Sequence, residues 1–159
     1  MMSVLCWSCT VQYKLNMASI DYTKIKTISI ADFPNRAPLV YPSLSQSFSE
    51  GLRNKFLSQT KLKNAKRDGH LQLEGDIIAY ELTPMAQGSD GYAKETKLTI
   101  TVQVRYTNTV NENENFDQKL SAYRTFPSSV TFESVQETLV DEIIKEISDL
   151  VFNKTVANW

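Results

Sequence analysis

Residues 97–107 alternate strictly between apolar and polar side chains, and this pattern constrains the fold more than any other feature of the sequence. The apolar set is Leu98, Ile100, Val102, Val104 and Tyr106, and the polar set is Lys97, Thr99, Thr101, Gln103 and Arg105. A period of two residues over this length predicts a β-strand with one buried and one solvated face. The chain is therefore expected to build a sheet with a core on one side.

Three further segments predict strands at 24–31, 71–82 and 116–126. In the first, Ile28 and Ile30 face one way. In the second, the apolar register switches after Gly75, which predicts a β-bulge near that residue. The third follows a polar stretch at 108–115 and is expected to pair with residues 97–107 as a hairpin. Ahead of these segments, Thr10 to Tyr22 forms either a short strand or an extended tether.

Two segments carry the spacing of amphipathic helices. From Ser43 to Gln59 the apolar stripe is Leu44, Phe48, Leu52 and Phe56, with Leu57 beside it. From Ser134 to about Asn153 the stripe is Val135, Leu139, Ile143, Ile147, Leu150 and Val151, widened by Val140 and Ile144. Ser43 is expected to cap the first helix, and Ser134 with Glu137 forms a capping-box pattern in the second.

The order of these elements, β-α-β-β-β-α, predicts an α+β fold. We expect one four-stranded sheet, mixed or antiparallel, with two long helices packed on one face. The length of 159 residues fits one domain, which we place at residues 10–159. Residues 1–9 are set apart as the remnant of a signal segment.

Composition excludes several classes of function. The net charge of −1 does not suggest nucleic-acid binding, and no apolar run is long enough for a membrane-spanning helix. The single histidine, His70, excludes most zinc sites and imidazole-based catalysis. We find no metal-ligand set, no cofactor motif and no catalytic constellation, and therefore predict a protein that binds and holds a partner and is not an enzyme.

The first nine residues are apolar, uncharged and contain both cysteines, Cys6 and Cys9. Their spacing matches a Cys-x-x-Cys redox pair, although nothing ahead of Cys6 could form the strand that such a site follows. A second interpretation is the end of a lipoprotein signal peptide, with Ser8 before a lipidated Cys9. The third is an N-terminus with incidental thiols.

Charge is distributed unevenly along the chain. Between residues 53 and 67 lie six bases and no acid, namely Arg53, Lys55, Lys61, Lys63, Lys66 and Arg67. From residue 112 to residue 149 acids predominate. The basic run could bind phosphates or an anionic lipid head group, or could be an ordinary solvated loop. Four aromatic residues expected at the surface, Phe33, Tyr41, Tyr92 and Trp159, are candidate anchors for a partner.

The stretch from Ile30 to Glu50, IADFPNRAPLVYPSLSQSFSE, resembles the Bacteroidetes branch of the LptE family of lipopolysaccharide-assembly lipoproteins. Further segments match in order: GDIIAY from Gly75, LTITVQV from Leu98, residues 116–126, DLVFNK from Asp149, and the final Asn158 and Trp159. The resemblance covers roughly residues 9–159. It implies two helices on one face of a four-stranded sheet, in agreement with the element order.

The resemblance also implies a function. Cys9 would be the lipidated residue and would anchor the protein to the outer membrane on its periplasmic face. The protein would plug and support the β-barrel LptD and take part in lipopolysaccharide delivery. Lys61, Lys63, Lys66 and Arg67 are then candidates for lipopolysaccharide contact. The alternative is a periplasmic lipid- or partner-binding module without a barrel.

Overall fold

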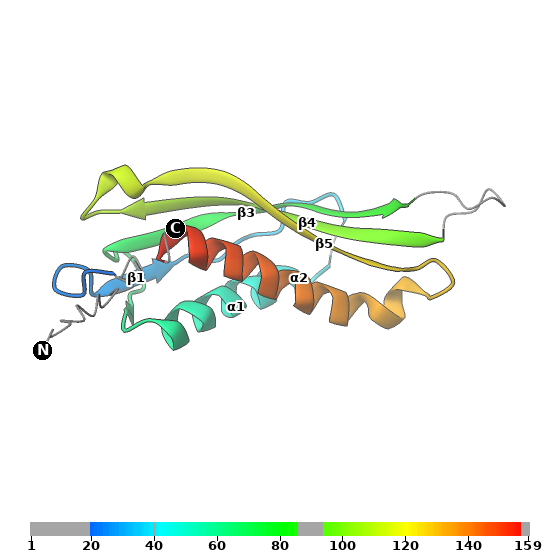
Figure 1. Cartoon of the computed structure of the whole chain (residues 1–159), viewed down its shortest axis with the longest axis horizontal. Coiled ribbons are helices and arrows are strands. Elements are labelled where there is room, and N and C mark those ends of the chain that lie inside the picture. Colours follow the sequence, from blue (N-terminus) through cyan, green and yellow to red (C-terminus); the bar gives the residue numbers. More distant parts are fainter. Residues whose placement is uncertain (1–19, 40, 86–93, 157–159) are drawn as a thin grey trace, which may run out of the picture.

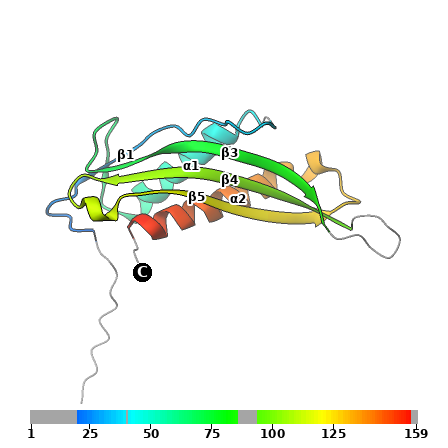
Figure 2. The ribbon, with the colours of Figure 1, turned by 90° about the horizontal axis from the view of Figure 1, so that it is seen from above.

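The computed structural model describes residues 20–39, 41–85 and 94–156, which form two layers. One layer is a β-sheet, and two helices lie side by side on one face of it (Figure 1 and Figure 2). The elements are β1 (Thr27–Ile30), α1 (Leu44–Gln59), β2 (Lys63–Asn64), β3 (Leu71–Pro84), β4 (Glu95–Asn108), the 3-10 turn η1 (Glu112–Glu114), β5 (Phe116–Pro127) and α2 (Phe132–Thr155). The predicted α+β fold is confirmed.

The sheet is mixed and has five strands where the sequence predicted four, in the order β2-β1-β3-β4-β5. Strand β1 is parallel to both of its neighbours, whereas β3, β4 and β5 form an antiparallel meander. The additional strand, β2, contains only Lys63 and Asn64, which are both exposed. Two exposed residues have no periodicity, so this edge strand leaves no signal in the sequence.

The bulge in β3 lies at Ile78, where the register with β4 shifts between Ile77 and Ala79. The predicted position near Gly75 was therefore wrong by three residues. The extra residue lets both Ile77 and Tyr80 face the core, where they are buried. Glycine is needed at residue 75 for a different reason, which is lack of space. A Cβ there would lie 1.9 Å from the carbonyl oxygen of Gln103 and 2.8 Å from the ring of Phe33.

The core lies between the helices and the inner face of the sheet. The predicted stripe of α1 is buried, as is most of the stripe of α2, but Leu57 and Leu150 are exposed and were assigned to the core wrongly. Gly51 faces α2, and a Cβ on residue 51 would lie 3.2 Å from Ile144 Cγ2, so glycine here lets the two helices pack closely.

Neither Ser43 nor Ser134 caps its helix through the side chain; the N-cap of α2 is Thr131.

The loop after β1 continues along β3 as a loosely paired extension of the sheet. Ala31 donates a backbone hydrogen bond to Leu73, and Arg36 donates one to Ile77. Between them Phe33 turns inward and is fully buried, with its ring edge-on to Phe48 at 5.2 Å between centroids. The prediction of Phe33 as a surface aromatic was wrong, because this loop is fastened to the sheet and turns the Phe33 ring into the core.

Candidate functional site

The four candidate cations, Lys61, Lys63, Lys66 and Arg67, lie on the connection between α1 and β3, at the β2 edge of the sheet. All four side chains are exposed. Within the described ranges, none of them forms an ion pair. The connection crosses the end of the molecule at which the described chain begins (Figure 1 and Figure 2). The structure therefore leaves the charges of these four residues available to a ligand.

The other two bases of the run have partners within the chain. Arg53 pairs with Asp32, and its Nε also donates to the carbonyl oxygen of Ile30 at 3.3 Å. Lys55 pairs with Asp149 of α2 and lies 5.4 Å from the centroid of the Phe152 ring. These two cations fasten α1 to the β1 loop and to α2. The basic run identified in the sequence thus divides into two structural residues and four exposed ones.

Lys61 and Lys63 lie beside the first residues of the described chain. The backbone N–H of Lys61 donates to the hydroxyl of Tyr22 at 3.3 Å, and its ammonium is 6.0 Å from the centroid of that ring. The backbone N–H of Lys63 donates to the carbonyl oxygen of Lys26 at 2.9 Å. Lys26 is exposed and adds a cation that the sequence analysis missed, because it lies far from residues 61–67 in the chain.

Lys66 and Arg67 line a separate shallow depression of about 200 Å³ beyond β2. Its other lining residues include Ser29 and Gln72, which offer hydrogen-bonding groups, and two acids, Asp68 and Glu74. A pair of cations among amide, hydroxyl and carboxylate groups can bind an anionic group that also carries hydroxyls.

The opposite side of the molecule is acidic. Arg124 of β5 reaches α2, where its Nε and Nη1 donate to Glu142 at 2.7 Å and to Glu146 at 2.6 Å. These hydrogen bonds raise the pKa of Arg124. Additional exposed acids of α2 are Glu133, Glu137 and Asp141. The charge asymmetry along the sequence therefore becomes an asymmetry across the sheet, from the basic β2 edge to the acidic β5 and α2 side.

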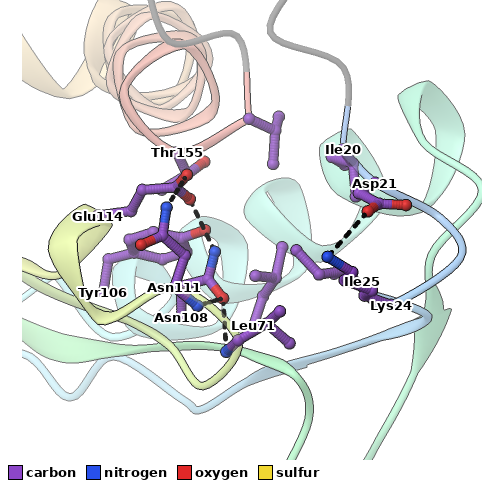
Figure 3. A pocket seen from close by; sticks show the side chains of 12 residues that line it. Ile20, Asp21, Lys24, Ile25, Leu71, Tyr106, Asn108, Asn111, Glu114 and Thr155 are labelled. Carbon is purple, nitrogen blue, oxygen red and sulfur yellow. Dashed lines mark hydrogen bonds and ion pairs between the residues drawn. The ribbon is translucent and has the colours of Figure 1, made fainter.

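A cavity of about 430 Å³ lies where the first described turn, the β4–β5 connection and the end of α2 meet (Figure 3). Its apolar lining comprises Ile20, Ile25, Leu71, Val110 and Val156. On its polar side, the carboxylate of Glu114 accepts hydrogen bonds from the amides of Asn108 and Asn111. Burial raises the pKa of the Tyr106 phenol, which also lines the cavity. Sequence patterns could not predict this cavity, because its walls come from four segments that are distant in the sequence.

His70 has a local structural role. Its backbone N–H donates to Thr27 Oγ1 at 3.1 Å, and its Nδ1 lies 2.7 Å from the same hydroxyl.

In the part of the chain that the structure describes, no group of three metal-ligating side chains is present. Neither described helix is long and apolar enough to cross a membrane.

Other residues singled out in the sequence have different positions. Tyr41 is half-buried and its ring stacks on that of Tyr80, 6.0 Å between centroids. Cys6, Cys9, Tyr92 and Trp159 lie outside the described residues. The interpretations of the two cysteines, as a redox pair, a lipidation site or incidental thiols, are therefore not tested by the geometry.

A model of the LptE family, described as lipopolysaccharide-assembly, matches residues 25–155, from just before β1 to the end of α2. No curated protein matches the chain. Several solved structures are similar to it. An uncharacterized lipoprotein B from Nitrosomonas europaea superposes with a TM-score of 0.62 at 14% identity, covering 89% of this chain and 86% of that one.

Two other structures are similar over most of their length. The hypothetical protein CT253 from Chlamydia trachomatis has a TM-score of 0.58 at 12% identity, covering 84% of this chain and 99% of that one. Rare lipoprotein B from Shewanella oneidensis has a TM-score of 0.54 at 19% identity, covering 80% of this chain and 92% of that one. At these identities the likeness establishes the fold.

Proposed function

The chain belongs to the LptE family of lipopolysaccharide-assembly proteins, and from this we propose that it is an outer-membrane lipoprotein of the lipopolysaccharide translocon. In this role it plugs and supports an LptD-like β-barrel and contacts lipopolysaccharide. The role is one of binding and support, without catalysis or a cofactor. The observation that carries the proposal is the family match over residues 25–155, which includes both helices and every strand of the sheet.

The anchor in this proposal is Cys9, acylated after removal of the preceding residues, with residues 10–159 as the mature domain on the periplasmic face of the outer membrane. Ser8 supplies the small residue that precedes a lipidated cysteine. Mass spectrometry of the mature N-terminus tests the anchor directly. A peptide that begins with acylated Cys9 is the expected result. An N-terminus at Met1 with free Cys6 and Cys9 thiols would contradict it.

The two-layer body suits a plug. Its helices and sheet enclose a continuous apolar core, so the outer surface is left mostly to polar side chains. The lumen of a large β-barrel is polar as well, and the two surfaces can meet through hydrogen bonds. We expect the full-length protein, extracted from outer membranes in mild detergent, to co-purify with a large β-barrel protein.

The competing hypothesis is a periplasmic lipid- or partner-binding module without a barrel. Site-specific photo-crosslinking in cells separates the two hypotheses, with the crosslinker at exposed positions on both layers, such as Tyr123 of β5 and Glu142 of α2. Adducts to one large barrel protein from both layers support enclosure in a lumen. Adducts to lipids or small periplasmic proteins alone favour the module.

Of the four candidate cations, Lys66 and Arg67 are the proposed contacts to the phosphates of lipopolysaccharide, because their charges have no partner among the described residues and they share a depression with hydrogen-bonding groups. The double variant K66E/R67E is expected to bind purified lipopolysaccharide at least about tenfold more weakly, since reversing two cations removes two charge-assisted contacts. The control K119E/K145E makes the same change in net charge on the opposite side of the molecule. Equal binding by the two variants would remove these residues from the proposed site.

A further inference from the structure

One exposed strip of the molecule combines cations from two distant parts of the chain at the point where the described chain begins. We name it the entry strip and define it by Tyr22, Lys26, Lys61 and Lys63. Tyr22 is only two residues from Ile20, the first described residue, and all four side chains are exposed. None of them lines the depression of Lys66 and Arg67 or the cavity at the end of the molecule.

The backbone fixes this strip. Lys63 N donates to Lys26 O at 2.9 Å, and residues 27 and 63 are partners in the parallel pairing of β1 with β2. Tyr22 joins the strip through its hydroxyl, which accepts from the backbone N–H of Lys61 at 3.3 Å. The ammonium of Lys61 also lies over the Tyr22 ring. The backbone segments that carry the three lysines and the phenol are therefore held next to one another at the β2 edge of the sheet.

Charges around the entry strip favour an anionic partner. Residues 20–30 and 60–70 together contain six basic and two acidic side chains. One of the acids, Asp21, pairs with Lys24 at 3.8 Å. The acids Glu112 and Glu114 belong to η1 in the β4–β5 connection, and Glu114 lines the cavity together with Asp21 and Lys24. The amides of Asn108 and Asn111 donate to the carboxylate of Glu114. The acidic α2 and β5 side would be repelled by an anionic surface, so the charge distribution orients the molecule.

We propose that the entry strip docks on the surface of a bilayer that contains anionic phospholipids. The inference rests on the proposed acyl anchor at Cys9. The chain between Cys9 and Ile20 can span up to ~40 Å when extended, so an anchor there does not fix the orientation of the domain. Each lysine next to an anionic bilayer strengthens the attraction between the domain and the bilayer, and tyrosine favours the interface between head groups and water. The strip thus holds the β2 edge against the membrane.

A bilayer fits the entry strip better than a single lipopolysaccharide head group does. The depression of Lys66 and Arg67 offers hydrogen-bonding groups around its cations, as recognition of a phosphorylated sugar requires. The entry strip offers lysine ammonium groups, which act as point charges, and one aromatic ring. Such a surface recognises an array of phosphates without demanding a particular sugar.

Co-sedimentation with lipid vesicles tests the proposal. The full chain carrying Cys9→Ser, which cannot be acylated, is mixed at low ionic strength with vesicles of phosphatidylethanolamine and phosphatidylglycerol, or with vesicles of phosphatidylcholine alone. Binding to the anionic vesicles only, and its loss in ~0.5 M salt, is expected. In the same background, K26E/K61E/K63E should bind anionic vesicles at least about tenfold more weakly. The control K94E/K119E/K145E, with the same net charge, should retain most of the binding.

Three results would overturn the proposal. Equal weakening by the two triple variants would mean that only net charge matters. Unchanged vesicle binding by K26E/K61E/K63E would remove the strip from the contact. Loss of binding to lipopolysaccharide micelles without loss of vesicle binding would assign the strip to lipopolysaccharide. Circular dichroism of each variant excludes misfolding. Because the protein in this test is not acylated, its outcome is separate from that of the mass spectrometry of Cys9.

Discussion

The hydroxyl of Ser49 accepts a hydrogen bond from the backbone N–H of Phe33 at 3.0 Å, and this contact fastens the loop after β1 to helix α1. Ser49 Oγ in turn donates to the carbonyl oxygen of Ser45, and Ser45 Oγ donates to that of Phe33, both at 2.7 Å. Two serines one turn apart thus satisfy both backbone groups of a fully buried phenylalanine. Polar side chains of α1 therefore help to hold the loop after β1 in place.

Replacing Ser49 with alanine should therefore destabilise the protein by about 1–2 kcal/mol. The buried N–H of Phe33 would lose its acceptor, at a cost of ~1–3 kcal/mol that a gain of ~0.5 kcal/mol in helix propensity offsets only partly. Urea unfolding followed by circular dichroism measures the change. Ser58→Ala, at an exposed position of the same helix, is the matched control and should change stability by less than ~0.5 kcal/mol. Equal effects of the two substitutions would assign no stabilising role to the Ser49 contact.

Gly75 and Gly51 should respond very differently to the same substitution. A methyl group at residue 75 would overlap the backbone of Gln103 on β4, and a strand backbone cannot move without breaking its ladder. At residue 51 the methyl would meet only the Cγ2 methyl of Ile144, at 3.2 Å, and the helix would gain ~1 kcal/mol in propensity. We expect Gly75→Ala to cost more than ~3 kcal/mol and Gly51→Ala to change stability by less than ~1 kcal/mol. Thermal unfolding of the two variants decides the comparison, and similar midpoints would refute it.

Local periodicity predicted the elements that have enough residues to repeat. Residues 97–107 and both helical stripes specify their buried faces within their own segments, so β4, α1 and α2 were found with small errors at their ends. Phe33 and β2 could not be found in this way. Phe33 stands between Asp32 and Pro34 in a segment without a period, and its burial depends on Gly75 and Phe48, which are distant in the sequence.

The candidate site shows the same limit. The run of bases from Arg53 to Arg67 is visible in the sequence, but the partners that neutralise Arg53 and Lys55 are Asp32 and Asp149, which only the fold brings close. Lys26 was missed for the converse reason, since parallel pairing of β1 with β2 brings it to Lys63. Sequence therefore predicts which charges are available, and tertiary structure decides which of them remain unpaired.

The carboxyl of Asp21, at the start of the described chain, should have a pKa below its ordinary value. The hydroxyl of Thr23 and then its backbone N–H, both donating to Asp21 Oδ1, lower the pKa of this carboxyl from 3.8, with a smaller contribution from Lys24. Because the pKa of this carboxyl is lower in the folded chain, any stability that it contributes is present when the pH is above its pKa in the unfolded chain. That stability is lost as the pH falls through its pKa in the folded chain. Thr23→Val should raise the pKa of Asp21 by more than Lys24→Met does, as followed by NMR of the carboxyl carbon. A larger shift in Lys24→Met would reverse the order of causes.

Arg124 is the main polar connection between β5 and α2, and its contribution should depend on salt. Because both of its partners, Glu142 and Glu146, are about half exposed, each ion pair contributes only ~0.2–1 kcal/mol. We expect Arg124→Met to destabilise the protein by about 0.5–1.5 kcal/mol at low ionic strength and by clearly less in ~0.5 M salt, where exposed pairs are screened. Lys119→Met, on the same strand and without an ion pair among the described residues, is the control and should show little change in either condition. If Arg124→Met lost the same stability in both salt concentrations, packing of its side chain would be responsible. The charges joining β5 to α2 would then be incidental to the fold.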